Sequence, residues 1–168
     1  SFTYGFKRHD PFVSREYRLE ARERMGADGK PVEPLDEAQL LQVLEEARRK
    51  GAQAIAICFL HSYKNPQHER RAAEIAAEFA DWFVTPSHAL SQEYREYERT
   101  STVVLNAFVG PKVSTYLARL ETLLSESGFK GKLFLMGSNG GVADVATVKR
   151  LPVLLMESGP GGGIAGAN

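Results

Sequence analysis

The feature that most constrains this sequence is a short apolar run, residues 54–60, that stops abruptly at a cluster of polar residues. A continuous apolar run of this length with two β-branched residues is typical of a strand covered by helices on both faces. Helical patterns flank the run on either side. We therefore predict an α/β fold whose mixed or parallel sheet is covered by helices and contains residues 54–60 as a central, buried strand.

The polar cluster after this run, HSYKNPQHE, is the first candidate for a site. In open α/β sheets, ligands bind in the loops that leave the carboxyl ends of the strands. His61 is the first polar residue after the strand, and imidazoles suit proton transfer near neutral pH, so we predict catalytic roles for His61 and Glu69. The alternative is a capped turn, because Asn65 is a good N-cap and Pro66 a good first helical residue.

Composition excludes several functional classes. The 168 residues suit a single globular unit, and 21 basic side chains balance 21 acidic ones, so no overall field attracts nucleic acid or an anionic membrane. The single cysteine, Cys58, lies inside the apolar run, which fits a core position and a reducing compartment. No signal peptide or membrane-spanning stretch is visible, so we expect a cytoplasmic protein. The chain lacks an initial methionine and closes on a glycine-rich stretch, and we expect a piece of a longer protein.

Sequence patterns divide the chain into three parts. Residues 1–30 are expected to form an irregular arm and a half-exposed edge strand over 14–25. Residues 31–127 are expected to hold the α/β segment. Its first helix starts at a capping-box pattern, Asp36 with Gln39, and its other elements are a helix over 66–79, a strand over 81–85 and a long helix over 94–127. Gly110 and Pro111 should kink or divide the long helix, because proline removes a backbone donor.

The third part, residues 128–168, repeats the pattern of a strand that ends in a polar, glycine-containing turn. We predict strands over 132–136 and 153–156, with a short helix from Asp144 between them. Turns follow at 137–141 and 157–163. If these strands lie parallel to the strand at 54–60, the turns near His61, Ser138 and Ser158 meet at one sheet edge.

Simple binding motifs are weak in this sequence. Gly161, Gly163 and Gly166 match the spacing of a dinucleotide fingerprint, but a tight turn with close packing explains the same glycines. His61, His68 and Glu69 match no strong metal signature, so we predict no metal site.

Four motifs occur in a characteristic order: HSYKNPQHE, YERTSTVVLNAFVGP, MGSNGGV and ESGPGGGIAGA. Together with the lead-in RLEARERMGADGKPVEPLDE, they resemble the hydantoinase A and 5-oxoprolinase family, whose relatives include the ATP-using subunits of acetone and acetophenone carboxylases. The resemblance covers nearly the whole chain, and several spaced motifs in order are more specific than any one of them.

The resemblance implies an ATPase fold similar to that of sugar kinases, chaperones and actin. Such proteins use ATP, with Mg²⁺, to activate a cyclic amide or a ketone for hydrolysis or carboxylation, and a hydantoinase B-type subunit or domain is the expected partner. Their two DxGGTxTD phosphate loops are absent from this sequence, so the resemblance implies a segment between those loops that does not bind ATP tightly alone. Where relatives have SGPAAGV, this chain has Gly161 and Gly162.

The residues expected to contact substrate or nucleotide belong to the last two motifs. They are Ser138, Asn139, Gly140, Gly141, Ser158, Gly159, Gly161 and Gly162. Two other functions remain open from the sequence: a nucleotide-binding oxidoreductase module built on the glycine fingerprint, and a non-catalytic interface segment whose polar turns are only caps.

Overall fold

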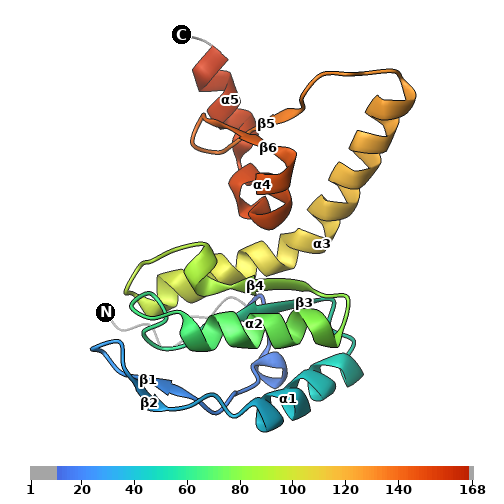
Figure 1. The fold of residues 1–168 in the computed structure, drawn as a ribbon. Helices are drawn as coiled ribbons and strands as arrows, with labels where there is room; N and C mark the ends of the chain where they lie inside the picture. Colours follow the sequence, from blue (N-terminus) through green and yellow to red (C-terminus); the bar gives the residue numbers. More distant parts are fainter. Residues whose placement is uncertain (1–10, 167–168) are drawn as a thin grey trace, which may run out of the picture.

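The computed structural model describes residues 11–166, whose helices and strands form two groups connected by the long helix α3 (Figure 1). The first group holds β1 to α2 and β4, and the second holds β5 to α5. In chain order, the elements are η1 (Arg15–Tyr17), β1 (Arg24–Met25), β2 (Pro31–Glu33), α1 (Glu37–Arg49), β3 (Ala54–Ile57), α2 (Gln67–Phe79), β4 (Phe83–Pro86), η2 (Ser87–Ala89), α3 (Glu96–Glu126), β5 (Phe134–Met136), β6 (Val142–Asp144), α4 (Val145–Arg150), η3 (Pro152–Leu155) and α5 (Ser158–Gly166).

The predicted α/β class is confirmed, but the prediction of one sheet is wrong. The described residues form three two-stranded sheets. Strand β3 pairs in parallel with β4, with Ala54 opposite Phe83 and Ile57 opposite Pro86. Strand β5 pairs antiparallel with β6, as β1 does with β2. A short turn returns β6 directly onto β5, and the two strands form a hairpin of their own, separate from β3.

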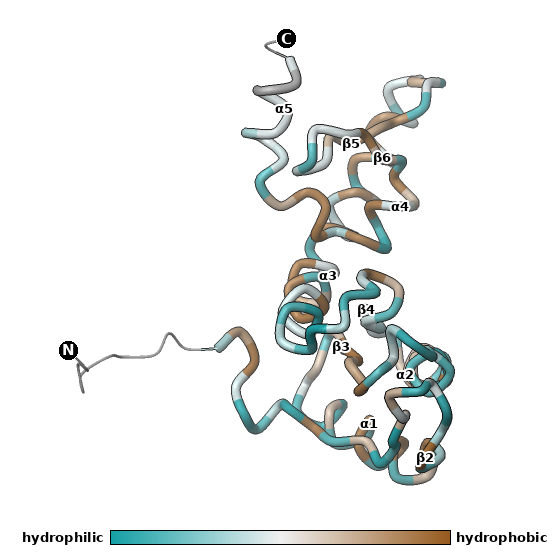
Figure 2. The backbone as a smooth tube through the Cα atoms, turned by 90° about the vertical axis from the view of Figure 1, so that its left-hand side faces the viewer, coloured by the Kyte–Doolittle hydropathy of each residue, from teal (hydrophilic) through white to brown (hydrophobic). Residues whose placement is uncertain are grey.

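The first hydrophobic core lies between α1, α2 and β3. Its buried members are Leu40, Leu44, Ile57, Ala72, Ile75 and Ala76. The predicted start of α1 is confirmed, because the Asp36 carboxylate caps the helix by accepting a hydrogen bond from the Gln39 N–H at 3.0 Å. Figure 2 shows hydrophobic stretches of the backbone at β3 and in α3.

Strand β3 is shorter and less buried than predicted. It covers residues 54–57 only, and Ala56 is exposed. In the described chain β3 has a single hydrogen-bonded neighbour, so one of its edges remains open. Cys58 is also only half-buried, which corrects the predicted core position, and its Sγ lies 3.0 Å from the Thr100 hydroxyl of α3.

Helix α3 runs without interruption through Gly110 and Pro111, so the predicted division of the helix is wrong and the kink is not confirmed. The role of Gly110 is to permit close packing. A β-carbon at this position would lie 2.3 Å from the Phe83 ring of β4. Beyond this contact, α3 enters the second core, where Leu117 packs with Val145 and Val148 of α4.

Two predicted strands are wrong. Residues 14–25 contain a 3₁₀ turn and only the short β1, because this mostly exposed segment finds little pairing. Residues 152–155 form the 3₁₀ helix η3, which begins with a buried proline that suits a first helical position. The chain then enters α5 at Ser158, in place of the predicted glycine-rich turn.

Several elements are confirmed. Helix α2 and strand β4 lie where the sequence predicts them, and α4 follows Asp144, which accepts a hydrogen bond from the Thr147 N–H. The first ten residues of the predicted arm lie outside the described part of the chain. Within residues 11–166, none of the helices has the length and apolar character needed to span a bilayer.

Candidate functional site

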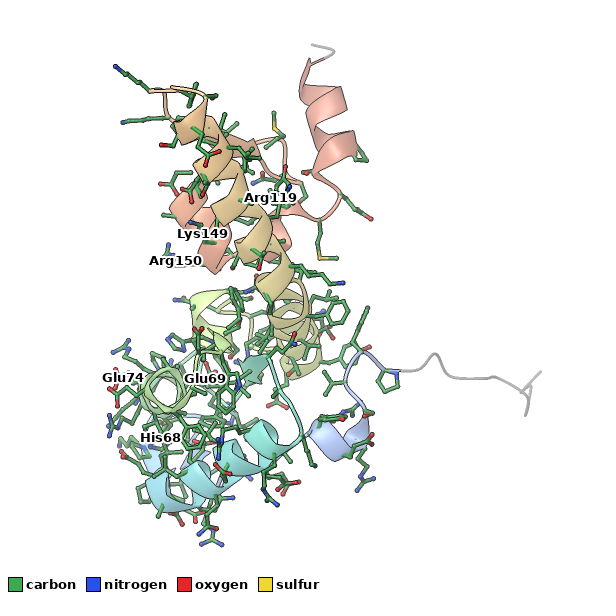
Figure 3. The ribbon with its side chains drawn as sticks, turned by 90° about the vertical axis from the view of Figure 1, so that its right-hand side faces the viewer. His68, Glu69, Glu74, Arg119, Lys149 and Arg150 are labelled. Carbon is green, nitrogen blue, oxygen red and sulfur yellow. The ribbon has the colours of Figure 1, made fainter. Side chains whose placement is uncertain are left out.

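Glu69 is the centre of a buried hydrogen-bond network that joins the carboxyl ends of β3 and β4. It lies in the first turn of α2, with 0% of its surface exposed. Its carboxylate accepts hydrogen bonds from the Phe59 N–H at 2.7 Å and the Ser87 hydroxyl at 2.6 Å. The backbone N–H and the ring Nδ1 of His88, each at 2.9 Å, donate to its other oxygen. Figure 3 shows Glu69 on a different side of α2 from Glu74.

This network explains how a carboxylate can be buried. Charge-assisted hydrogen bonds and the N-terminal end of a helix both stabilise a negative charge. A second hydroxyl, that of Ser62, lies 3.1 Å from Ser87 and extends the network to the loop after β3. Since the Glu69 carboxylate is enclosed by protein donors, it orients Phe59 and His88 in this geometry.

His61 occupies an unusual backbone conformation in the same loop. Its φ of 59° lies in the left-handed region, which costs a residue with a β-carbon free energy. Its carbonyl accepts hydrogen bonds from the N–H groups of Lys64 and Asn65, at 2.9 and 3.2 Å. The half-buried ring has its Nδ1 atom buried, without a hydrogen-bond partner among the described residues. The ring meets the Tyr63 ring edge-on at 6.0 Å.

Arg99 of α3 is a candidate site residue that the sequence did not reveal. Its surface is 1% exposed, and its guanidinium donates to the Phe59 carbonyl at 2.8 Å and to the Glu93 carbonyl at 3.5 Å. It also lies over the Tyr63 ring at 5.6 Å. The signal that could have found it is an arginine on the same helix face as Val103 and other buried residues, within the motif YERTSTVVLNAFVGP.

The other polar residues of the cluster have structural partners. Asn65 accepts a hydrogen bond from the Gln67 N–H at 3.0 Å and donates to the Gly29 carbonyl at 2.8 Å, but Pro66 holds the N-cap position predicted for Asn65. His68 pairs with Glu23 at 2.7 Å, and both side chains are buried. No group of three or more His, Cys, Asp and Glu residues suited to a metal occurs between residues 11 and 166.

The predicted site at Ser138 to Gly141 is the turn of the β5–β6 hairpin. The Gly137 N–H donates to the Gly141 carbonyl at 2.7 Å, and the Asn139 side chain accepts from the Gly141 N–H at 3.0 Å. Gly140 adopts a positive φ of 76° within this turn. The Ser138 N–H donates to the carbonyl of Leu154 at 2.8 Å, which fixes the hairpin to η3.

Helix α5 packs directly against this hairpin. A β-carbon on Gly161 would lie 2.9 Å from the Ser138 carbonyl oxygen, and one on Gly162 would lie 3.3 Å from the Met136 side chain. A β-carbon on Gly159 would meet nothing within 4 Å. The two glycine-rich motifs, including Ser158 at the first position of α5, therefore form one unit.

The predicted meeting of three turns is confirmed for two of them, because the start of α5 lies against the Ser138 turn, but it is wrong for His61 and for a shared sheet edge. His61 follows β3, whereas Ser138 follows β5 in another sheet, and the two groups lie on different sides of α3 in Figure 1. The dinucleotide fingerprint also lacks its required strand, because Gly161, Gly163 and Gly166 lie inside a helix that follows η3.

A cavity of about 280 Å³ lies where the first group of elements meets α4. Its walls come from β4, the segment after it and the end of α4, and they include Lys149 and Arg150. Lys149 is already paired with Glu121 of α3 at 2.5 Å. Figure 3 shows Lys149 and Arg150 on α4 and Arg119 on α3, where Arg119 lines a second, more open hollow of about 480 Å³.

Two family models match the chain in succession. The model described as the hydantoinase/oxoprolinase N-terminal region matches residues 2–80, and the one described as hydantoinase/oxoprolinase matches residues 99–168. An uncharacterized protein of Methanocaldococcus jannaschii is 40% identical over 94% of this chain and 23% of its own length. The caprolactamase alpha subunit of Pseudomonas jessenii is 37% identical over 88% of this chain and 21% of its own length.

Solved structures agree with the sequence matches. The crystal structure of the ATP-dependent caprolactamase from Pseudomonas jessenii superposes with a TM-score of 0.85 at 35% identity, covering 96% of this chain and 23% of that one. A nucleotide-free structure of acetone carboxylase gives a TM-score of 0.80 at 29% identity, covering 95% of this chain and 23% of that one. The chain thus spans about a quarter of the length of these relatives. On the order of its motifs, its two successive family matches and this shared structure, the chain belongs to the hydantoinase/oxoprolinase family.

Proposed function

We propose that this chain is a segment of an ATP-dependent enzyme that activates a cyclic amide or a ketone for hydrolysis or carboxylation. The observation that carries the proposal is the likeness to the ATP-dependent caprolactamase over nearly the whole chain, in sequence and in structure. Relatives named 5-oxoprolinase and acetone carboxylase widen the class of substrate to carbonyl compounds in general. An actin-like or sugar-kinase-like ATPase fold for the whole enzyme is part of this proposal.

The hairpin turn and the start of α5 are the segment's best fit to ATP. Backbone N–H groups at a helix N-terminus favour phosphate, and Gly159 leaves room for close approach. When bound, ATP supplies a phosphoryl group that activates the carbonyl oxygen. Mg²⁺ that binds with ATP is held by phosphate oxygens and one or two carboxylates, and this proposal places those carboxylates outside the chain.

His61 is the proposed substrate contact. Its strained backbone supports this role, since residues in rare conformations cluster at functional sites when the surrounding structure holds them in place. A hydantoinase B-type subunit or domain is the proposed partner, which is supported by relatives that are themselves named as subunits. A cytoplasmic location stays a prediction.

An exchange of segments tests the proposed function. This chain would replace the corresponding segment of the Pseudomonas jessenii caprolactamase alpha subunit, and ADP release would be measured with lactams, hydantoins, 5-oxoproline and ketones, with and without bicarbonate. We expect ADP release that depends on a carbonyl substrate. A folded exchange enzyme whose ADP release does not respond to any carbonyl compound would contradict the proposal.

The isolated chain provides a second test. Phosphoryl transfer depends on loops and cations that surround the phosphates, and the family's two phosphate loops are absent from this sequence. We therefore expect calorimetric titration of the chain with Mg-ATP to show no micromolar binding. Micromolar binding would show that the main ATP-binding site lies within these residues.

A further inference from the structure

We propose that Arg99 and Glu69 are positioning residues that hold the His61 imidazole so that its Nε2–H donates a hydrogen bond to the carbonyl oxygen of the substrate. This inference rests on the proposed function for its substrate class. It assigns the imidazole the role of a neutral hydrogen-bond donor, which differs from that of a general base.

The backbone of His61 is held in a conformation that is unfavourable for a residue with a β-carbon. His61 and Glu157 are the non-glycine residues with positive φ in the described chain. Such a conformation persists only where neighbouring contacts over-determine it. Here the contacts that hold the His61 conformation are made by the backbone N–H and carbonyl of Phe59, two residues before His61.

Both backbone groups of Phe59 are hydrogen-bonded to charged side chains. Its N–H donates to the buried Glu69 carboxylate at 2.7 Å, and its carbonyl accepts from the buried Arg99 guanidinium at 2.8 Å. Glu69 belongs to α2 and Arg99 belongs to α3, so both helices hold the backbone in place just after β3. Both hydrogen bonds are charge-assisted, and both charged side chains are buried, so each is stronger than a hydrogen bond between neutral groups.

Tyr63 connects the Arg99 guanidinium to the His61 imidazole. Arg99 lies over the Tyr63 ring at 5.6 Å from its centroid, and the His61 ring meets the same aromatic ring edge-on at 6.0 Å. Cation–π and edge-to-face contacts both have preferred geometries. The position of the His61 ring is therefore coupled to Arg99 through Tyr63.

The buried Nδ1 of His61 decides which nitrogen carries the proton. It has no acceptor among the described residues. A proton on Nδ1 would leave a buried donor without an acceptor, whereas a bare Nδ1 leaves only a lone pair unused, so the proposal places the ring proton on Nε2. Lactams, hydantoins and ketones all present a carbonyl oxygen, and a hydrogen bond from Nε2–H would polarise it without a change in the charge of the ring.

Nuclear magnetic resonance of the 168-residue chain tests the positioning. Nitrogen-15 shifts of the His61 ring, assigned with His61→Gln, should show a single Nε2–H tautomer. In Arg99→Gln the ring should lose its contact with Tyr63 and become a mixture of tautomers, whereas Arg71→Gln, which removes an exposed arginine paired with Glu37, should change neither. An Nδ1–H tautomer in the unmodified chain, or unchanged His61 signals in Arg99→Gln, would overturn the proposal.

Variants that retain both buried charges guard against a failure to fold. Tyr63→Leu keeps Glu69 and Arg99 and should still release the His61 ring, and Arg99→Lys should restore part of the order. In the full enzyme, His61→Ala should lower kcat about 100-fold with little change in KM, as removal of one transition-state donor does. An active enzyme with unchanged kcat in His61→Ala contradicts this inference and the proposed His61 contact but leaves the ATP-dependent activity standing, whereas an unmodified enzyme without ATP-dependent turnover contradicts the proposed function as a whole.

Discussion

Gly110 of α3 lies directly against the aromatic ring of Phe83 on β4, so close that a β-carbon at position 110 would overlap the ring at 2.3 Å. This contact sets how near the long helix approaches the strand. It lies at the boundary between the two groups of elements, because the helix passes from the first core to the second just beyond it.

Gly110→Ala is therefore expected to destabilise the chain. Alanine favours a helix over glycine by about 1 kcal/mol, but overpacking against a ring costs more, and we expect a net loss of about 1–2 kcal/mol in the free energy of unfolding. Denaturant unfolding measures this change. Gly163→Ala is the matched control, because its β-carbon would meet nothing within 4 Å, and it should be neutral or stabilising. The added variant Phe83→Leu should recover part of the loss in Gly110→Ala.

Asn106 is predicted to stabilise the junction between β4, α4 and η3. Its buried amide, 0% exposed, donates to the Thr85 hydroxyl and the Arg150 carbonyl, both at 3.2 Å, and accepts from the Val153 N–H at 3.1 Å. Asn106→Ala leaves these buried groups unpaired, so we expect a loss of about 3 kcal/mol.

Thermal or denaturant unfolding measures the effect of Asn106→Ala. Asn139→Ala is the control, because Asn139 is an exposed turn residue with one hydrogen bond to the backbone. Equal effects of the two substitutions would show that the buried amide does not hold the junction together.

Asp36→Ala should weaken the start of α1. The carboxylate satisfies the Gln39 N–H at 3.0 Å, and the loss of such a cap costs about 1 kcal/mol. Asp36→Ser retains a capping oxygen and should restore most of the stability. Helix content from circular dichroism and unfolding midpoints would be compared among the three chains, and a serine variant as unstable as the alanine variant would argue against a capping role.

The Asp144 cap of α4 should make the stability of the folded chain depend on pH. The hydrogen bond from the Thr147 N–H lowers the pKa of Asp144 below its usual value of 3.8. A carboxyl group whose pKa is lower in the folded state stabilises that state above its unfolded pKa, and this stability is lost as the pH falls through the folded pKa. The stability difference between the chain and Asp144→Asn should thus shrink below about pH 4. A difference that stays constant from pH 6 to pH 2 would contradict this linkage.

The sequence by itself determined the helices that are marked by a cap or by a periodic apolar pattern. Asp36 with Gln39 marks the start of α1, Asp144 marks the start of α4, and the periodic apolar residues of α2 give its extent. Caps and helical periodicity depend on neighbours within a few residues, so they can be read without the fold. The four motifs likewise indicate the family by their order alone, because that order is a property of the linear chain.

Only the tertiary structure decided what lies next to what. The apolar pattern at residues 153–155 gave no indication of a 3₁₀ helix rather than a strand, because a short apolar run fits either. The pairing of β5 with β6, which separates Ser138 from His61, depends on hydrogen bonds between strands. Arg99 was missed for the same reason, since its partners at Phe59 and Tyr63 lie about forty residues away in sequence. A buried charge acquires its role from long-range contacts, and those exist only once the chain has folded.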